Sequence, residues 1–202
     1  LNGQDHTPSL PLLPGEKEEA EAVMKEMAPD FLGLRVGFAP GSVWPTKRWP
    51  WEYYAELAGR LIGELPAVVF LVGGSEDAPL GEKIVKKVAR RELINLIGKL
   101  TLRISAALID RMDAMVTNDT GLLHVARARG VPTVSIFGAT TDRLFHFGQK
   151  DRHLTPKIDC HPCTAHGGQR CPEGHFDCMK GIGVDRVYEA VTSILDGPES
   201  KT

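Results

Sequence analysis

The feature that most constrains the fold is a regular alternation between short apolar runs and segments with helical periodicity. Ala67–Val72, for example, is apolar throughout, rich in β-branched residues, and followed by a Gly- and Ser-bearing loop. Such a run is typical of a strand buried on both faces of a parallel sheet. The predicted strands are Val36–Ala39, Ala67–Val72, Leu93–Ile97, Ala114–Thr117 and Thr133–Phe137. The predicted helices between and after them are Glu52–Glu64, Leu80–Arg91, Leu102–Met112, Leu122–Arg129 and Val184–Leu195.

This alternation predicts an α/β fold, a doubly wound parallel sheet of the Rossmann-like type with helices on both faces. Right-handed crossover connections bring the carboxyl ends of all the strands to one edge of such a sheet. The loops that follow the predicted strands carry Gly, Ser, Thr and Asp. Ligands bind open parallel sheets in the crevice at that edge, so we expect the functional site there.

Residues 1–30 differ from the rest of the chain. They begin without Met, carry Pro and Gly, and run into a charged helix that starts near Gly15 or Glu16. An extended Pro-bearing lead-in is typical of an interdomain connector. We therefore expect residues 1–30 to be an interdomain linker with a flanking helix, and residues 31–202 to be one Rossmann-like domain. The alternative is an ordinary N-terminal arm.

Composition excludes several classes of protein. The net charge is -2, so no global basic surface points to nucleic acid. No apolar run approaches the ~18 residues of a membrane-spanning helix, and no signal-peptide pattern is present. The cysteines all fall between Cys160 and Cys178, unlike those of a secreted disulfide scaffold, which are spread along the chain. We expect a cytoplasmic protein without a transmembrane segment.

The motif with the strongest chemical implication is NDTGLLH at residues 118–124, which follows a predicted strand and opens a predicted helix. Asp119 or Thr120 is suited to cap that helix, and Gly121 lets a ligand approach the backbone closely. The free N–H groups and partial positive charge of a helix N-terminus favour phosphate. His124 lies one turn beyond Thr120, so its imidazole is placed for the same anion. The alternative is a capped helix with a packed histidine.

The loop at residues 40–50 carries two adjacent cations, Lys47 and Arg48, into the next helix. At the ligand edge, Lys47 is a point charge suited to phosphate, whereas Arg48 suits a surface or interdomain contact. A basic pair in a loop is otherwise a solvated feature. The three tryptophans of the chain lie between residues 44 and 51. We expect them to pack the loop or to meet a partner domain rather than to stack on a base.

A third loop, Gly73–Asp77, follows the most apolar predicted strand. A carboxylate just beyond a Gly-rich strand end is placed to accept hydrogen bonds from ribose hydroxyls. Glu76 is the candidate for this contact. The sequence has no G-x-G-x-x-G motif, which disfavours a nicotinamide or flavin cofactor. The alternative is that Glu76 and Asp77 only cap the next helix.

The cysteine-rich segment, residues 160–178, has the spacing C-x2-C-x7-C-x6-C. Its thiols are Cys160, Cys163, Cys171 and Cys178. Four thiolates this close in sequence suit a structural zinc site or an iron–sulfur cluster, and two disulfides are the alternative. The spacing differs from the paired C-x2-C of common zinc ribbons. In each interpretation the segment has a structural role.

Together these motifs resemble those of the ADP-heptose:lipopolysaccharide heptosyltransferases, glycosyltransferase family 9. The resemblance runs from about Arg35 to Leu195 and rests on KRWP at residues 47–50, on NDTGLLH at residues 118–124, and on the strand order between them. The Cys-Met-Lys sequence at residues 178–180 is also similar. The family has the GT-B architecture, two Rossmann-like domains facing across a cleft. The resemblance therefore implies that this chain is the C-terminal, donor-binding half, and that the acceptor site and an Asp general base belong to an N-terminal domain.

The resemblance implies an ADP-sugar donor and assigns roles to residues that match the family motifs. The donor-binding residues are Ser42, Lys47, Glu76, Leu100, Asp119, Thr120, Gly121 and His124. Lys47 would contact the donor phosphates and Ser42 would line their pocket. Residues 119–124 would hold the pyrophosphate at the helix start. Glu76 would bind the ribose, and Leu100 would border the adenine.

The activity that the resemblance implies is transfer of L-glycero-D-manno-heptose from ADP to the lipopolysaccharide inner core, with type II favoured among the heptosyltransferases. Members of the family invert the anomeric centre by direct displacement and require no metal at the reaction centre. The resemblance places the enzyme at the cytoplasmic face of the bacterial inner membrane, with peripheral membrane association. The isolated chain is expected to be inactive, because the general base lies in the other domain.

Two alternatives remain open at this stage. One is another GT-B transferase, or a sugar-nucleotide epimerase, that uses a UDP-sugar. The other is a noncatalytic nucleotide- or metal-binding module in which the cysteines matter most. Preference for ADP or UDP separates the first alternative from the heptosyltransferase, and metal content with chelator sensitivity tests the second.

Overall fold

A computed structural model describes residues 9–29, 31–143, 145 and 147–196. Six parallel strands form one sheet in the order β3-β2-β1-β4-β5-β6. The strands are β1 (Leu34–Ala39), β2 (Ala67–Leu71), β3 (Leu93–Asn95), β4 (Ala114–Asn118), β5 (Thr133–Ile136) and β6 (Arg152–Leu154). The strand order reverses between β1 and β4, where β1 pairs with β2 on one side and with β4 on the other. The predicted doubly wound parallel sheet is confirmed.

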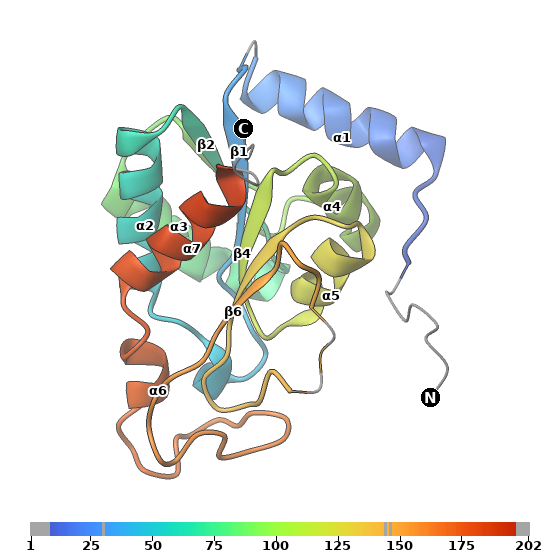
Figure 1. Ribbon diagram of the computed structural model, residues 1–202. Helices are drawn as coiled ribbons and strands as arrows, with labels where there is room; N and C mark the ends of the chain where they lie inside the picture. Colours follow the sequence, from blue (N-terminus) through green and yellow to red (C-terminus); the bar gives the residue numbers. More distant parts are fainter. Residues whose placement is uncertain (1–8, 30, 144, 146, 197–202) are drawn as a thin grey trace, which may run out of the picture.

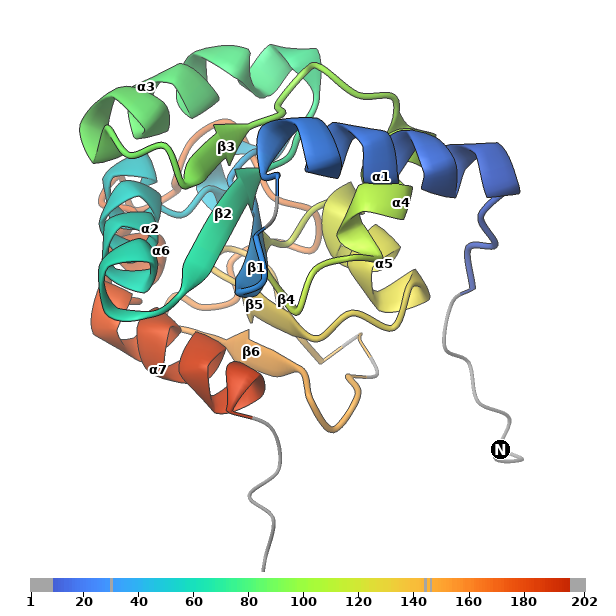
Figure 2. The same ribbon diagram turned by 90° about the horizontal axis from the view of Figure 1, so that it is seen from above.

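Helices cover both faces of the sheet (Figure 1). They are α1 (Pro14–Met27), α2 (Trp51–Glu64), α3 (Ala78–Val88), α4 (Leu102–Ile109), α5 (Gly121–Ala128), α6 (Asp177–Lys180) and α7 (Val184–Leu195), with short 3-10 turns η1 (Pro45–Lys47) and η2 (Ser75–Asp77). Figure 2 shows α2 and α7 on one side of the strands and α1, α4 and α5 on the other. In the part of the chain that the structure describes, no helix is both long and apolar enough to cross a membrane.

Two hydrophobic clusters, one on each face, hold the layers together. Side chains such as Leu57 and Val187 pack from α2 and α7 against Phe38 and its neighbours. On the other face, Leu108 packs against Phe70. All five of these side chains are completely buried. Each buried large apolar side chain stabilises the fold by roughly 1.5–3 kcal/mol, so the sheet and the positions of its loops form a rigid unit.

Helix α1 lies across the second face and packs on α4, as both views show (Figures 1 and 2). Glu16 joins the two helices, because Arg103 of α4 donates to both of its carboxylate oxygens at 2.7 Å. Glu16 also accepts the backbone N–H of Leu13 at 2.8 Å, which satisfies a free donor at the helix start. The flanking helix predicted within residues 1–30 is present. Residues 1–8 and 30 lie outside the described part, and the interdomain role of the segment stays a prediction.

Several predicted boundaries were wrong by a few residues. Helix α3 ends at Val88 rather than Arg91, because Ala89 adopts a left-handed conformation with φ 48° that stops the helix. Helix α4 begins where predicted, with Thr101 as a cap that accepts the N–H of Ile104, but it ends at Ile109. The sequence analysis missed β6 and α6 altogether. Both are only a few residues long, and β6 is largely polar, so neither has an apolar periodicity that reveals it.

Candidate functional site

A cavity of ≈ 320 Å³ lies at the carboxyl edge of the sheet, beside the switch in strand order between β1 and β4. Loops after β1, β2 and β4 form its walls together with α4 and the start of α5. Its lining residues are Ala39, Gly41, Ser42, Val43, Val72, Gly73, Gly74, Glu76, Asp77, Leu100, Leu102, Ser105, Thr120, Gly121, Leu122 and Val125. Five of the predicted donor-binding residues therefore line one cavity: Ser42, Glu76, Leu100, Thr120 and Gly121.

The N-terminus of α5 faces this cavity without a side-chain cap. Thr120 is the N-cap residue, with extended φ and ψ of -148° and 171°, but its side chain makes no capping hydrogen bond. The prediction that Asp119 or Thr120 caps the helix through its side chain was wrong, because the Asp119 carboxylate is bound elsewhere. A Cβ atom at Gly121 would meet no atom within 4 Å, so the space over the first turn is open. The partial positive charge of the helix end is thus available to a ligand.

Lys47 and Asp119 form a shielded ion pair next to that helix end. The Lys47 Nζ lies 2.6 Å from the Asp119 Oδ2, and their side chains are only 13% and 10% exposed. Thr140 donates its hydroxyl to the same carboxylate oxygen at 2.7 Å. Charge-assisted contacts of this kind hold the Lys47 ammonium group and the Asp119 carboxylate in fixed orientations. The structure therefore brings Lys47 from the β1 loop to the NDTG motif, although neither residue lines the cavity itself.

Asn118, at the end of β4, holds the loop after β1 by hydrogen bonds. This buried amide accepts the backbone N–H of Trp49 at 3.1 Å and the hydroxyl of Tyr54 at 3.2 Å. It donates to the carbonyl of Pro40 at 2.8 Å. The Trp49 indole is itself buried and donates to the carbonyl of Ile182 at 2.7 Å. The prediction that the tryptophans pack the loop is confirmed for Trp49.

Two acidic side chains line the cavity at η2. The Glu76 carboxylate folds back over Gly74, and the Asp77 carboxylate lies against Gly41, so that a side chain at either glycine would collide with it. Burial raises the pKa of the Asp77 carboxyl, and the negative charge of Glu76 raises it further. Asp77 occupies the cap position of α3 but makes no side-chain capping hydrogen bond, so the capping alternative was wrong for this residue.

Asp77 is a cavity residue that the sequence analysis did not assign to the donor. Its neighbour Glu76 was preferred for the ribose contact, and both residues line the cavity. The sequence hint to Asp77 is the glycine at position 41, because the absence of a side chain there leaves room for the Asp77 carboxylate. That signal is visible only once the β1 and β2 loops are seen side by side.

His124 is exposed on α5, so it is not a packed core histidine. Its ring stacks on Phe145, with ring centroids 5.4 Å apart and an interplanar angle of 26°. Phe145 in turn stacks on Phe147, and Phe147 on His153. His124 lies outside the cavity lining, one turn along the helix whose start lines it. Its predicted contact with the donor stays a prediction.

The cysteine-rich segment lies at the lower edge of the molecule in Figure 1. Cys160, Cys163, Cys171 and Cys178 are free thiols, and Cys178 is buried. Hydrogen bonds from backbone N–H groups, that of Phe176 first, lower the pKa of Cys171. Burial raises the pKa of Cys178. Among the residues described, no three His, Cys, Asp or Glu side chains are grouped closely enough to hold a metal ion. The structural zinc stays a prediction.

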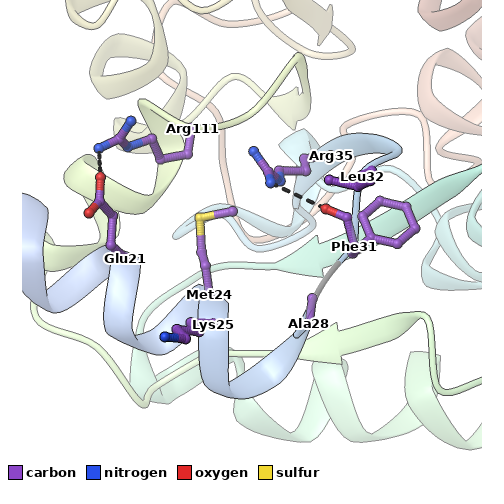
Figure 3. A pocket seen from close by; sticks show the side chains of 8 residues that line it. All are labelled: Glu21, Met24, Lys25, Ala28, Phe31, Leu32, Arg35 and Arg111. Carbon is purple, nitrogen blue, oxygen red and sulfur yellow. Dashed lines mark hydrogen bonds and ion pairs between the residues drawn. The ribbon is translucent and has the colours of Figure 1, made fainter.

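A second cavity, of ≈ 350 Å³, lies beside α1 (Figure 3). Its lining residues are Glu21, Met24, Lys25, Ala28, Phe31, Leu32, Arg35 and Arg111. Arg35 lies near the start of β1, and Arg111 shortly precedes β4 and pairs with Glu21, so this cavity is at the amino edge of the sheet. It is slightly larger than the other cavity but contains none of the predicted site residues. We assign the functional site to the carboxyl edge, where the strand-end loops and the α5 N-terminus converge.

Known proteins that are similar to this chain in sequence and fold identify its family. Residues 6–171 match the family model of glycosyltransferase family 9 (heptosyltransferase). The chain is 40% identical to lipooligosaccharide heptosyltransferase 2 of Haemophilus influenzae over 131 residues, which is 61% of this chain and 38% of that protein. It is also 40% identical to lipopolysaccharide heptosyltransferase 2 of Escherichia coli over 168 residues, 79% of this chain and 46% of the relative.

A solved structure agrees with the sequence relatives. The structure of ADP-heptose lipopolysaccharide heptosyltransferase II of E. coli superimposes with a TM-score of 0.77 at 29% identity, covering 99% of this chain and 57% of that one. The chain thus spans about half the length, or less, of the curated relatives it matches. By the match of its sequence and fold, the chain belongs to glycosyltransferase family 9, the heptosyltransferases.

Proposed function

We propose that this chain is the donor-binding half of a heptosyltransferase II, which transfers heptose from ADP-L-glycero-D-manno-heptose to the lipopolysaccharide inner core. The observation that carries the proposal is the convergence, at one sheet edge, of an uncapped helix N-terminus, the Lys47–Asp119 ion pair and the carboxylate of Glu76. The first two suit a pyrophosphate, and the third suits a ribose. The E. coli structure and the H. influenzae relative are both named as heptosyltransferases of this type.

Each part of the donor is assigned to the residues of the site whose chemistry suits it. The pyrophosphate sits at the first turn of α5, where backbone N–H groups and the cation of Lys47 neutralise its charge. Glu76 accepts hydrogen bonds from the ribose hydroxyls. Leu100, partly buried on the cluster beneath α4, provides an apolar border for the adenine. Ser42 lines the phosphate end of the cavity, and His124 contributes its ring nitrogen to the same anion.

The proposed reaction is a single displacement that inverts the anomeric carbon. A hydroxyl oxygen of the acceptor sugar forms a bond to that carbon as the bond to the ADP oxygen breaks, and a general base takes the hydroxyl proton. Negative charge grows on the departing ADP, where Lys47 and the α5 dipole stabilise it. Because these groups supply the leaving-group stabilisation, this mechanism requires no metal ion at the reaction centre. The base and the acceptor site belong to a facing domain, so the chain alone binds donor but transfers no heptose.

We place the complete enzyme at the cytoplasmic face of the bacterial inner membrane, peripherally associated, because its proposed acceptor is a lipid-anchored sugar. No part of this proposal involves nucleic acid, in keeping with the net charge of -2.

The first test is titration of the purified chain with ADP, UDP and adenosine by calorimetry. The proposal predicts measurable ADP binding, weaker adenosine binding because the phosphates are missing, and a preference for ADP over UDP. Equal affinity for UDP would favour the UDP-sugar alternative. Absence of any adenine-nucleotide binding would overturn the donor-site assignment.

Two variants then test the phosphate contacts. Lys47→Ala and His124→Ala should each weaken ADP binding by roughly tenfold to a hundredfold, since a hydrogen bond to a charged group is worth about 1.5–3 kcal/mol. Adenosine binding should change much less. The exposed Lys17 offers a matched control, and Lys17→Ala should bind ADP as the unmodified chain does. Thermal melting establishes that each variant is folded; unchanged ADP binding in both site variants would contradict the assignment.

A further inference from the structure

The cysteine-rich segment contacts the loop that carries Lys47. Gly168 donates its N–H to the Thr46 hydroxyl at 2.8 Å, and its carbonyl accepts the Thr46 hydroxyl at 3.0 Å and the Thr46 N–H at 3.2 Å. Thr46 is only 3% exposed. Gly167 packs directly against Trp44, with no room for a side chain. The 3-10 turn that ends at Lys47 is therefore held by a segment more than a hundred residues away in sequence.

The same segment also contacts the turn after β5. The N–H groups of Cys163 and Thr164 both donate to the carbonyl of Ala139, at 3.0 and 3.1 Å. The Nδ1 of His161 lies 2.7 Å from the carbonyl of Gly138. A carbonyl only accepts, so this ring nitrogen carries the proton. These contacts fix the turn whose next residue is Thr140.

Thr140 completes a chain of contacts that ends at the Lys47 ammonium group. Its hydroxyl, on a side chain only 3% exposed, donates to the Asp119 Oδ2 at 2.7 Å. The same oxygen is 2.6 Å from the Lys47 Nζ. Residues 161–168 thus hold Lys47 along two routes, directly through Thr46 and indirectly through Thr140 and Asp119.

We propose that Thr46 and Thr140 are positioning residues for the Lys47 cation, and that residues 161–168 act as the bracket that joins them. A lysine side chain has four flexible carbons, so ordering it only when phosphate binds costs conformational entropy. The two threonine hydroxyls remove that cost in advance by fixing the turn and the carboxylate that orient the ammonium group. The inference deepens the proposed function, since it rests on Lys47 contacting the donor phosphates.

The test compares Thr140→Val with Thr140→Ser. Valine keeps the shape of the side chain but leaves Asp119 without its neutral donor, whereas serine keeps the hydroxyl. We expect Thr140→Val to weaken ADP binding by about threefold to tenfold, with adenosine binding unchanged and Thr140→Ser close to the parent chain. Thr46→Val should give the same pattern through the other route. Thr192→Val, which removes a hydroxyl bonded within α7, is the matched control.

A second measurement does not depend on nucleotide. The rate at which an amine-reactive reagent acetylates Lys47, followed by mass spectrometry, reports how firmly the ammonium group is held. It should be slow in the parent chain and in Thr140→Ser, and at least severalfold faster in Thr140→Val and Thr46→Val. If the rates change in this way but the parent chain does not bind ADP, the positioning stands and the phosphate role of Lys47 fails.

Two results would overturn the inference. One is parent-like ADP binding and Lys47 reactivity in folded Thr140→Val and Thr46→Val. The other is an equal loss of ADP and adenosine binding without a change in Lys47 reactivity, which would indicate a general structural role. If Thr140→Val does not fold, Thr46→Val alone decides between these outcomes.

Discussion

The surroundings of Asp77 disfavour a negative charge on its carboxyl group. Burial raises the pKa of its carboxyl and the neighbouring Glu76 raises it further, while Arg48 and the N–H of Gly74 only partly offset these effects. The folded state therefore prefers the protonated carboxyl more than the unfolded chain does. An unfavourable carboxylate that lines a cavity is typical of a functional site, where stability is given up for ligand recognition.

At the residue scale we predict that Asp77→Asn raises the melting temperature near neutral pH. Above the raised pKa, the folded parent chain bears the cost of ionising Asp77, and asparagine removes that cost while keeping an oxygen to accept the Gly74 N–H. As pH falls below the ordinary carboxyl pKa, Asp77 is protonated in both states and the gain disappears. Melting curves of both chains at pH 7.5 and near pH 4 measure the difference. An equal gain at both pH values would show that ionisation is not the cause.

The cysteine-rich segment holds two distant loops of the molecule in place. It is almost free of regular structure, yet its backbone joins the loops after β1 and β5. Its thiols also differ from one another in their surroundings. Partial desolvation of the Cys163 sulfur raises the pKa of this thiol, and the nearby Cys160 raises it further. Backbone N–H groups instead lower the pKa of Cys171.

At the element scale we predict an order of thiol reactivity. Cys171 should react first with iodoacetamide near pH 7.5, because its lowered pKa leaves more thiolate at that pH. Cys163 is exposed, and its alkylation rate should approach that of Cys171 as the pH approaches 9. Cys178, buried and with a raised pKa, should be slowest throughout. Mass spectrometry of labelled peptides gives the rates; faster labelling of Cys163 than of Cys171 at pH 7.5 would contradict the prediction.

The same samples test the predicted structural zinc. Metal analysis of the purified chain measures zinc directly, and thiolates that bind zinc are protected from alkylation until a chelator is added. A metal-free chain with no effect of chelator on labelling or folding would rule out the zinc site. The labelling order above is therefore measured after treatment with chelator.

At the scale of the whole molecule, the sheet is most strongly held at its centre. Strands β1 and β4 each pair with a strand on both sides and lie between the two hydrophobic clusters. Strands β3 and β6 form the edges and are only three residues long. The proposed site lies beside the central pair, so its loops extend from the best-held strands of the sheet.

We predict that amide hydrogen exchange follows this arrangement. The amides of β1 and β4 should exchange only through global unfolding, whereas those of β6 should exchange at least tenfold faster through local opening. Exchange measured by mass spectrometry on peptides covering each strand gives the comparison. Addition of ADP should slow exchange at the start of α5 as well. Protection of β6 equal to that of β1 would contradict this account of the sheet.

Much of this molecule was predictable because its signals are local. Short apolar runs and periodic helices determine the α/β class, and strands such as β2 are recognisable from a few consecutive residues. The NDTG motif and the basic loop were likewise visible as a helix start and a cation that follow strands. Family resemblance then supplied roles that spacing alone does not provide.

Tertiary structure decided which side chains meet. Asp119 was expected at the helix cap, but folding brings Lys47 and Thr140 to its carboxylate, and those contacts replace the cap. Residues 161–168 join the loops after β1 and β5, which are far apart in the sequence, mainly through backbone groups that carry no sequence signal. The sequence by itself therefore determined most of the elements, the edge and the family, because these depend on local pattern. The partners within the site depend on distances between remote segments, and only the folded chain sets those distances.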